Sequence, residues 1–188
     1  MSYLSKSLNL LRGAGLATLL ASAATAVFAA PESLTIALPG DLPGLDPSKD
    51  TSPLGFNYRL NVYDALTELQ RDGEMNGRLA ESWTHSEDLK TWTFKLREGV
   101  KFHDGSDFTA DDVVFTIERV LADATTPLRT YVRLVEKVEA VDPHTVTFTL
   151  NQAYSLFYRQ ISYVNIMSRT YFDKVGDQGY ATKPIGTG

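Results

Sequence analysis

Residues 79–120 read LAESWTHSEDLKTWTFKLREGVKFHDGSDFTADDVVFTIERV and predict two strands, a turn and a helix in that order. Apolar and polar side chains alternate strictly from Thr91 to Arg97, with Trp92, Phe94 and Leu96 on one face. A period of two that is rich in aromatic and β-branched residues is typical of a half-buried strand. We therefore expect this strand to turn its aromatic face toward a core.

The second half of the stretch predicts a turn followed by a helix. Asp104-Gly105 is a strong tight-turn signal where it separates alternating apolar residues. Thr109 lies at an N-cap position, and acidic residues follow it at the positive end of the helix dipole. The expected apolar face at helical spacing consists of Val113, Val114, Ile117, Val120 and Leu121.

The ordered motifs LAESW, LREGVKFHDG and FTADDVVFTIERV resemble the signature region of extracellular solute-binding protein family 5. Members of this family are the periplasmic dipeptide-, oligopeptide- and nickel-binding components of ABC importers. The resemblance implies an α+β fold, the N-terminal part of a two-lobed periplasmic binding protein (class II-like), with a mixed sheet and flanking helices. It is specific for the family and not for the ligand.

The resemblance also implies a domain order. Residues 30–66 would begin the large ligand-binding lobe, residues 67–180 would form the smaller family-specific lobe, and residues 181–188 would begin the return to the large lobe. The run PIGTG at residues 184–188 resembles the segment that precedes this return. We therefore expect the sequence to correspond to about the first third of a full-length relative.

Four candidate ligand-binding residues follow from the same resemblance. Asp41, Leu42 and Pro43 match strand-end residues that run beside a bound peptide, and Tyr131 matches a tyrosine that lines the ligand cavity. A surface turn for the first three, and a core or surface role for Tyr131, are the alternatives. Pro39 and Pro43 lack the N–H groups that a peptide would use, which weighs against backbone pairing at this edge.

The first 29 residues are typical of a secretory signal peptide. Lys6 and Arg12 give a basic start, an uncharged Ala- and Leu-rich run follows, and Val27-Phe28-Ala29 fits a cleavage site. A membrane anchor is the alternative, but the run is short and rich in small residues. No cysteine lies near the cut, so we expect a free periplasmic protein of a Gram-negative bacterium that is not lipid-anchored.

Charge and composition exclude several function classes. The net charge of −5 becomes −7 without residues 1–29, which hold Lys6, Arg12 and no acidic residue, so a nucleic-acid partner is not expected. The sequence has no cysteine, and its three histidines are isolated at spacings that do not suit metal ligation. We expect no cofactor, no metal site and no enzymatic activity, because turn and capping roles account for His103, Asp104, Asp111 and Asp112.

Outside the signature, the sequence predicts helices at Pro53–Asp64 and Ser155–Ile161, a hairpin of Val135–Val141 with Val146–Leu150, and a short strand at Val164–Met167. A first strand is expected at Ser33–Leu38. Phe56, Leu60 and Tyr63 share an apolar stripe of the first helix, and Leu156 and Ile161 are expected to be buried in the second. Trp83 and Trp92 are interpreted as core residues rather than stacking platforms for a ligand.

The expected function is capture of a small solute, most simply a di- or oligopeptide, and its delivery by a monomer to an inner-membrane ABC permease. A truncated, non-transporting fragment and a ligand-sensing module are the alternatives. The identity, size and charge of the ligand are not determined by these residues.

Overall fold

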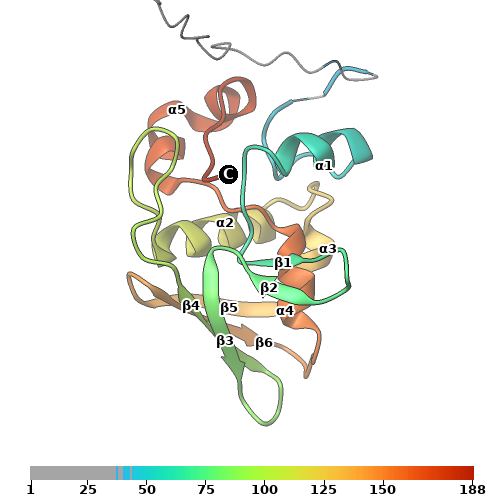
Figure 1. The fold of residues 1–188 in the computed structure, drawn as a ribbon, viewed down its shortest axis with the longest axis vertical. Helices are drawn as coiled ribbons and strands as arrows, with labels where there is room; N and C mark the ends of the chain where they lie inside the picture. Colours follow the sequence, from blue (N-terminus) through green and yellow to red (C-terminus); the bar gives the residue numbers. More distant parts are fainter. Residues whose placement is uncertain (1–36, 38–39, 43) are drawn as a thin grey trace, which may run out of the picture. The chain divides into compact units, whose positions relative to one another are not determined.

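The computed structural model describes residues 37, 40–42 and 44–188, and an antiparallel sheet of four strands forms the base of this part of the chain (Figure 1). The strand order is β3-β4-β6-β5. The strands are β3 (Ala80–His85), β4 (Thr91–Leu96), β5 (Val135–Asp142) and β6 (Thr145–Leu150). The strand predicted from residue 91 and the predicted hairpin are confirmed, and the strand pairs that the described residues form are all antiparallel.

The two central strands place their large side chains on one face. Trp92 pairs with Phe148 and Phe94 with Val146, and all four side chains are at most 1% exposed. On the opposite face, the hydroxyls of Thr93 and Thr147 lie 3.1 Å apart. The alternation read from the sequence therefore separates a core face from a polar face, as expected for a sheet covered on one side.

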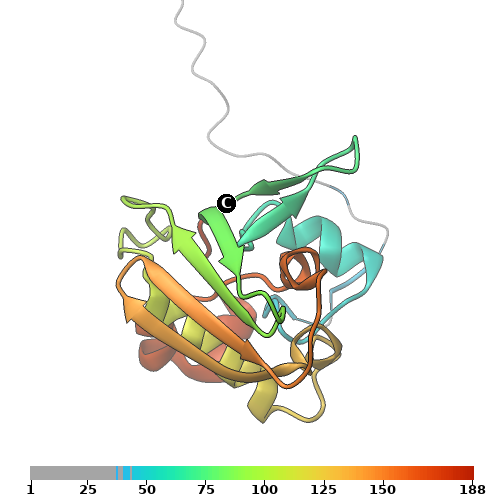
Figure 2. The ribbon, with the colours of Figure 1, turned by 90° about the horizontal axis from the view of Figure 1, so that it is seen from below.

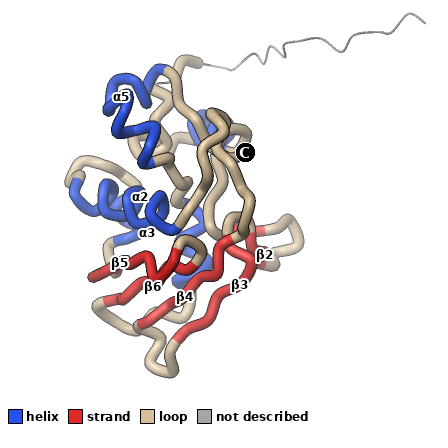
Figure 3. The backbone as a smooth tube through the Cα atoms, turned by 90° about the vertical axis from the view of Figure 1, so that its left-hand side faces the viewer, coloured by secondary structure: helices blue, strands red, loops and turns tan. Residues whose placement is uncertain are grey.

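Helix α2 (Ala110–Ala122) covers the core face of the sheet (Figure 2). It begins after Thr109, whose backbone N–H donates to the Asp112 carboxylate at 2.9 Å. The Thr109 hydroxyl also donates to this carboxylate, rather than accepting from a backbone N–H. Val113, Ile117 and Val120 are buried, which confirms the predicted apolar face. In Figure 3, α2 and α3 (Arg129–Val132) lie on the same side of the sheet.

A two-stranded ladder and a short helix precede the main sheet. They are β1 (Thr67–Leu69), β2 (Met75–Gly77) and α1 (Pro53–Arg59). The prediction of a helix to Asp64 was wrong, because the helix ends at Arg59 and a looser turn follows. The expected core positions Phe56 and Leu60 are 40% and 54% exposed, because α1 turns this side away from the core.

The segment after β6 is more irregular than the sequence predicts. It contains α4 (Phe157–Gln160), the 3-10 helix η1 (Ile161–Tyr163) and α5 (Arg169–Thr182), which is kinked at Gly176. Leu156 is exposed, and residues 164–167 form no strand although they are buried, so both predictions were wrong. Their backbone groups find other partners instead: the Ile166 N–H donates to the Asp64 carbonyl, and the Met167 N–H to the Thr116 hydroxyl.

Residues 185–188 return to the segment that follows α1. The Gly188 N–H donates to the Val62 carbonyl at 3.2 Å, and the Thr187 hydroxyl donates to the Asp64 carboxylate at 2.8 Å. A Cβ on Gly186 would lie 1.9 Å from the Val62 oxygen, so only glycine allows this approach.

The expected signal peptide at residues 1–29 lies outside the described residues, and so does the expected first strand apart from Ala37. In the part of the chain that is described, the helices are all too short or too polar to cross a bilayer.

Removal of the Trp92 side chain tests the aromatic core. We expect Trp92→Ala to lower the free energy of unfolding by about 3–5 kcal/mol, because it leaves a large cavity under α4. Urea denaturation followed by circular dichroism measures this loss. The control Val141→Ala, at a 65% exposed position, should change the free energy by less than about 0.5 kcal/mol. Equal effects of the two variants would contradict a core role for Trp92.

The buried Asp112 carboxyl should produce a pH dependence of stability. Burial raises the pKa of Asp112, although the backbone N–H groups of Arg169 and Thr109 partly oppose the rise. The folded protein then binds this proton more tightly than the unfolded chain does, so stability falls as pH rises from the unfolded pKa of about 3.9 through the folded value.

This contribution is measured as the difference in unfolding free energy between the wild type and Asp112→Asn from pH 3 to pH 7. We expect the advantage of the wild type to shrink as pH rises. A difference that is constant or grows with pH would contradict the raised pKa.

Candidate functional site

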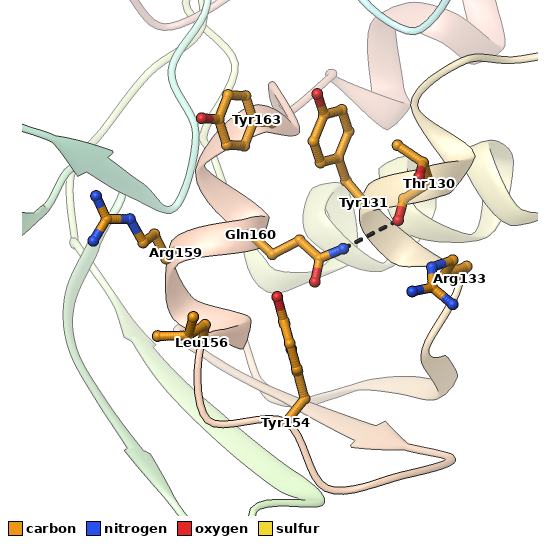
Figure 4. Close-up of a pocket in the computed structure, with 8 residues that line it drawn as sticks. All are labelled: Thr130, Tyr131, Arg133, Tyr154, Leu156, Arg159, Gln160 and Tyr163. Atoms are coloured by element: carbon orange, nitrogen blue, oxygen red, sulfur yellow. Dashed lines mark hydrogen bonds between the residues drawn. The ribbon is translucent and has the colours of Figure 1, made fainter.

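A surface hollow of about 320 Å³ lies where α3 meets the segment that follows β6 (Figure 4). Its lining is rich in tyrosine and arginine, and contains no acidic side chain. The lining residues are Thr130, Tyr131, Arg133, Tyr154, Leu156, Arg159, Gln160 and Tyr163. The structure thus places the predicted site residue Tyr131 in a concave surface rather than in the core.

Tyr131 forms one side of the hollow by stacking on Tyr163. The two ring centroids lie 4.7 Å apart and the planes are inclined by 13°. Buried Leu128 and Val132 hold α3 against the core, so that Tyr131 between them projects outward. One face of this helix turn packs on the core and the other lines the hollow, so the packing of Leu128 and Val132 fixes the position of Tyr131.

The opposite side of the hollow is fixed by Phe157. Its ring lies 5.2 Å from Phe148 and 6.0 Å from Trp92, so α4 is fastened to the core face of the sheet. Gln160, at the end of α4, donates its amide to the Thr130 carbonyl at 3.0 Å and joins the two sides of the hollow (Figure 4). A rigid aromatic surface with adjacent amide and guanidinium donors suits a small polar solute with an apolar part.

The other predicted site residues are not brought to this hollow. Asp41 is exposed and Leu42 is half-buried, and neither lines the hollow. Pro43 lies outside the described residues. A ligand role for this loop therefore stays a prediction.

A second hollow, of about 500 Å³, surrounds Arg119 of α2. The Arg119 guanidinium donates to Asp46 at 2.7 Å and to Asp177 at 2.6 Å. Burial alone would lower the pKa of Arg119, but the hydrogen bonds to these two carboxylates raise it overall. Since Arg119 already has its counter-ions, it fastens the turn at Asp46 to α2 and α5, and we assign it a structural role.

The histidine and acidic residues form no metal-binding cluster within the described residues. His103 contacts the C-terminal segment instead, since Nδ1 accepts from the Gly186 N–H at 3.3 Å and Nε2 lies 2.8 Å from the Gly188 oxygen. Asp104 accepts from the backbone and hydroxyl of Ser106 within the turn, which lowers its pKa.

The sequence did not identify Tyr154, Gln160 and Tyr163 as site residues. Their spacing carries no motif, and they meet Tyr131 only because α4 and η1 fold back toward α3. One available signal was the presence of three tyrosines and one arginine between residues 154 and 163, beside only two large aliphatic residues.

A model of the bacterial extracellular solute-binding proteins, family 5, middle region, matches residues 74–188. This is more than half of the chain. It includes the four-stranded sheet, α2 and every residue that lines the tyrosine-rich hollow.

Curated relatives extend the similarity toward the N-terminus. The chain is 36% identical over 176 residues to di/tripeptide-binding protein 1 of Pseudomonas aeruginosa, covering 79% of this chain and 33% of the relative. It is 35% identical over 178 residues to the glutathione-binding protein GsiB of Shigella flexneri, covering 93% of this chain and 34% of the relative. The chain therefore spans about a third of the length of the curated relatives that it matches.

Solved structures give the same result for the fold. The periplasmic binding protein AgaA of A. tumefaciens in complex with agropinic acid has a TM-score of 0.73 and 30% identity, over 79% of this chain and 30% of that protein. DppA of Helicobacter pylori in complex with the peptide STSA has a TM-score of 0.69 and 29% identity, over 77% of this chain and 33% of that protein. These similarities confirm the α+β fold expected for the N-terminal part of a two-lobed binding protein.

A double-mutant cycle tests the stacked pair. We expect Tyr131→Ala and Tyr163→Ala together to cost less than the sum of the two single changes, by about 0.5–1.5 kcal/mol in the free energy of unfolding. The two rings contact each other in the stack, so either single change removes the same interaction. Strict additivity of the two losses would contradict the stacking geometry.

Proposed function

Because the chain belongs to family 5 of the bacterial extracellular solute-binding proteins, we propose that it serves as the solute-capturing component of an ABC importer. In this proposal, a di- or oligopeptide or a similar small solute is bound in the periplasm and delivered to the inner-membrane permease. The family match over residues 74–188 is the observation that carries the proposal. No covalent step is required of the chain.

The tyrosine-rich hollow supports a role in binding. Tyr131 and Tyr163 offer a stacked aromatic surface that is partly open to solvent, since Tyr163 is 42% exposed. Aromatic surfaces accept varied side chains, because they supply contact area with little loss of rotamer freedom. Together with donors such as those of Gln160, this surface would hold a solute without reading one specific sequence.

We propose further that Asp41, Leu42 and Pro43 approach the same solute from the other side. In this arrangement, the solute's main chain would run along the loop, as in peptide recognition by strand addition. The prolines limit the number of N–H donors there, so side chains and carbonyl groups would carry more of the binding.

The course of the backbone supports the proposed domain order. Residues 185–188 bond to Val62 and Asp64, which belong to the segment that the proposal assigns to the large lobe. The smaller lobe, residues 67–180, would thus be inserted between two neighbouring segments of the large one. The chain would then cross between the lobes twice, at neighbouring positions. Paired connections of this kind can form the hinge about which periplasmic binding proteins close.

Closure would strengthen binding through desolvation. When two lobes enclose a peptide, its polar groups leave water and each must find a hydrogen-bond partner, at a cost of about 1–3 kcal/mol for each one left unpaired. Selectivity would then follow from the donors and acceptors that line the closed site, and release at the permease from reopening of the lobes.

Calorimetric titration of the complete polypeptide with a mixed di- and tripeptide pool tests the proposal. We expect binding at micromolar concentration or tighter, weakened about tenfold by Tyr131→Ala and much less by Tyr131→Phe, because the phenylalanine keeps the stacked ring.

The control is Val141→Ala, at an exposed position outside the lining of the hollow, which should leave the affinity unchanged. A complete polypeptide that is folded and binds neither the pool nor any co-purifying small molecule in native mass spectrometry would refute the proposal.

A further inference from the structure

A histidine side chain supplies the hydrogen-bond acceptor for a buried backbone N–H of the returning segment, residues 185–188. Gly186 is buried, so its N–H must find a partner within the protein. Among the described residues, this partner is Nδ1 of His103, at 3.3 Å. The Gly186 carbonyl in turn accepts from the His103 backbone N–H at 3.0 Å. One residue, 83 positions earlier in the chain, therefore bonds to both polar groups of the Gly186 backbone.

These contacts determine the protonation state of the His103 imidazole. A ring nitrogen that accepts a hydrogen bond carries no proton, so the ring is neutral and its proton lies on Nε2. The second contact agrees, because Nε2 lies 2.8 Å from the Gly188 oxygen, which can only accept. An imidazolium carries N–H on both nitrogens and would turn its Nδ1–H toward the Gly186 N–H, so that two donors face each other.

The returning segment is bonded at the same time to the segment that follows α1. The Gly188 N–H donates to the Val62 carbonyl at 3.2 Å, and the Thr187 hydroxyl donates to the Asp64 carboxylate at 2.8 Å. Residues 186–188 thus contact both His103 and residues 62–64. In the proposed domain order these two segments are the connections between the lobes, so the imidazole joins the turn at Asp104-Gly105 to the hinge.

The charged groups on the turn of His103 do not compete for its contacts. Asp104 accepts from the hydroxyl and the backbone N–H of Ser106, which lowers the pKa of the Asp104 carboxyl. Its charge is therefore constant between about pH 5 and 8, the range in which histidine ordinarily titrates. Lys101 pairs with Asp107 within the same turn.

Two other elements bring charge close to this turn. Asp64 of the segment after α1 accepts from Arg78 at 2.6 Å, besides its bond to the returning segment. Lys174 of α5 helps to lower the pKa of Asp104 through its charge. Each of these charged groups has an opposite charge of its own, whereas the imidazole of His103 bonds to the returning segment.

From these contacts, and resting on the proposed function, we propose that His103 is a positioning residue for solute capture, whose neutral imidazole holds the returning connection and whose protonation releases it. The His103 side chain is exposed, so the proton arrives directly from solvent. The acceptor for the buried Gly186 N–H is then lost, which costs free energy. Because periplasmic binding proteins close about such connections, a loosened connection lowers the affinity for the solute.

The first measurement follows the contact itself, by NMR of the complete polypeptide labelled with nitrogen-15. At about pH 7.5 we expect the neutral tautomer of His103 with its proton on Nε2. Protection of the Gly186 amide from hydrogen exchange, relative to an unfolded peptide at the same pH, should be at least about tenfold lower at pH 5, because the N–H has lost its acceptor.

Variants assign this change to the imidazole. His103→Asn keeps an acceptor near the position of Nδ1 and does not titrate, so Gly186 should stay protected at both pH values. His103→Leu fills a similar volume without an acceptor, so protection should be low at both. The matched control is His85→Asn, which removes another exposed histidine, at the end of β3, and should leave the pH dependence as in the wild type.

The second measurement is calorimetric titration of the same polypeptides with the di- and tripeptide pool at both pH values. We expect the wild type to bind about fivefold more weakly at pH 5, because the connection is then intact in only a fraction of the molecules. His103→Asn should lose much less affinity over the same range. This comparison removes any effect of pH on the peptides themselves.

The outcomes separate this inference from the proposed function. A proton on Nδ1 at pH 7.5, or Gly186 protection that is the same at both pH values, would overturn it whether or not peptides bind, and neither result requires His103→Leu to fold. Protection that falls while affinity stays constant would show that His103 supports only the fold. Absence of peptide binding to the wild type at pH 7.5 would refute the proposed function itself, and with it the role of His103 in capture.

Discussion

The packing of Phe157 on the aromatic face of the central strands is the interaction on which the candidate site depends. Its ring contacts Trp92, Phe94 and Phe148, which are inward-facing residues of β4 and β6. This contact anchors α4, and α4 carries Gln160 and leads into Tyr163. The same hydrophobic burial that stabilises the sheet, about 25 cal/mol per Å² of apolar surface, therefore also fixes one side of the hollow.

Charge is distributed in two different ways around this core. Arg119, in the interior between α2 and α5, has two carboxylates and holds the fold together. Arg59, the last residue of α1, has no hydrogen-bond partner for its Nε and Nη1 atoms. Arg119 therefore contributes to the fold through two ion pairs, whereas burial of the Arg59 guanidinium without such a pair costs free energy.

Sequence reasoning was most accurate where one strong periodicity governed a segment. The alternation around Trp92 and Phe94, the Asp104-Gly105 turn and the apolar face of α2 all lie where they were expected. It failed for Phe56, Leu60 and Leu156, which are apolar and yet exposed. Such residues match the helical period, but only the packing of α1 and α4 determines which side of these short helices faces the core.

The sequence by itself determined the family, the α+β class and the place of Tyr131 as a candidate binding residue, because these depend on local periodicity and on an ordered set of motifs. Only the tertiary structure decided which residues surround Tyr131 and where charge is left unpaired. Tyr163 is 32 positions away from it, and no local pattern encodes the stacking of the two rings. Such contacts arise when helices from distant parts of the chain pack against one sheet. The same packing decides which buried arginine meets carboxylates, as Arg119 does, and which does not, as for Arg59.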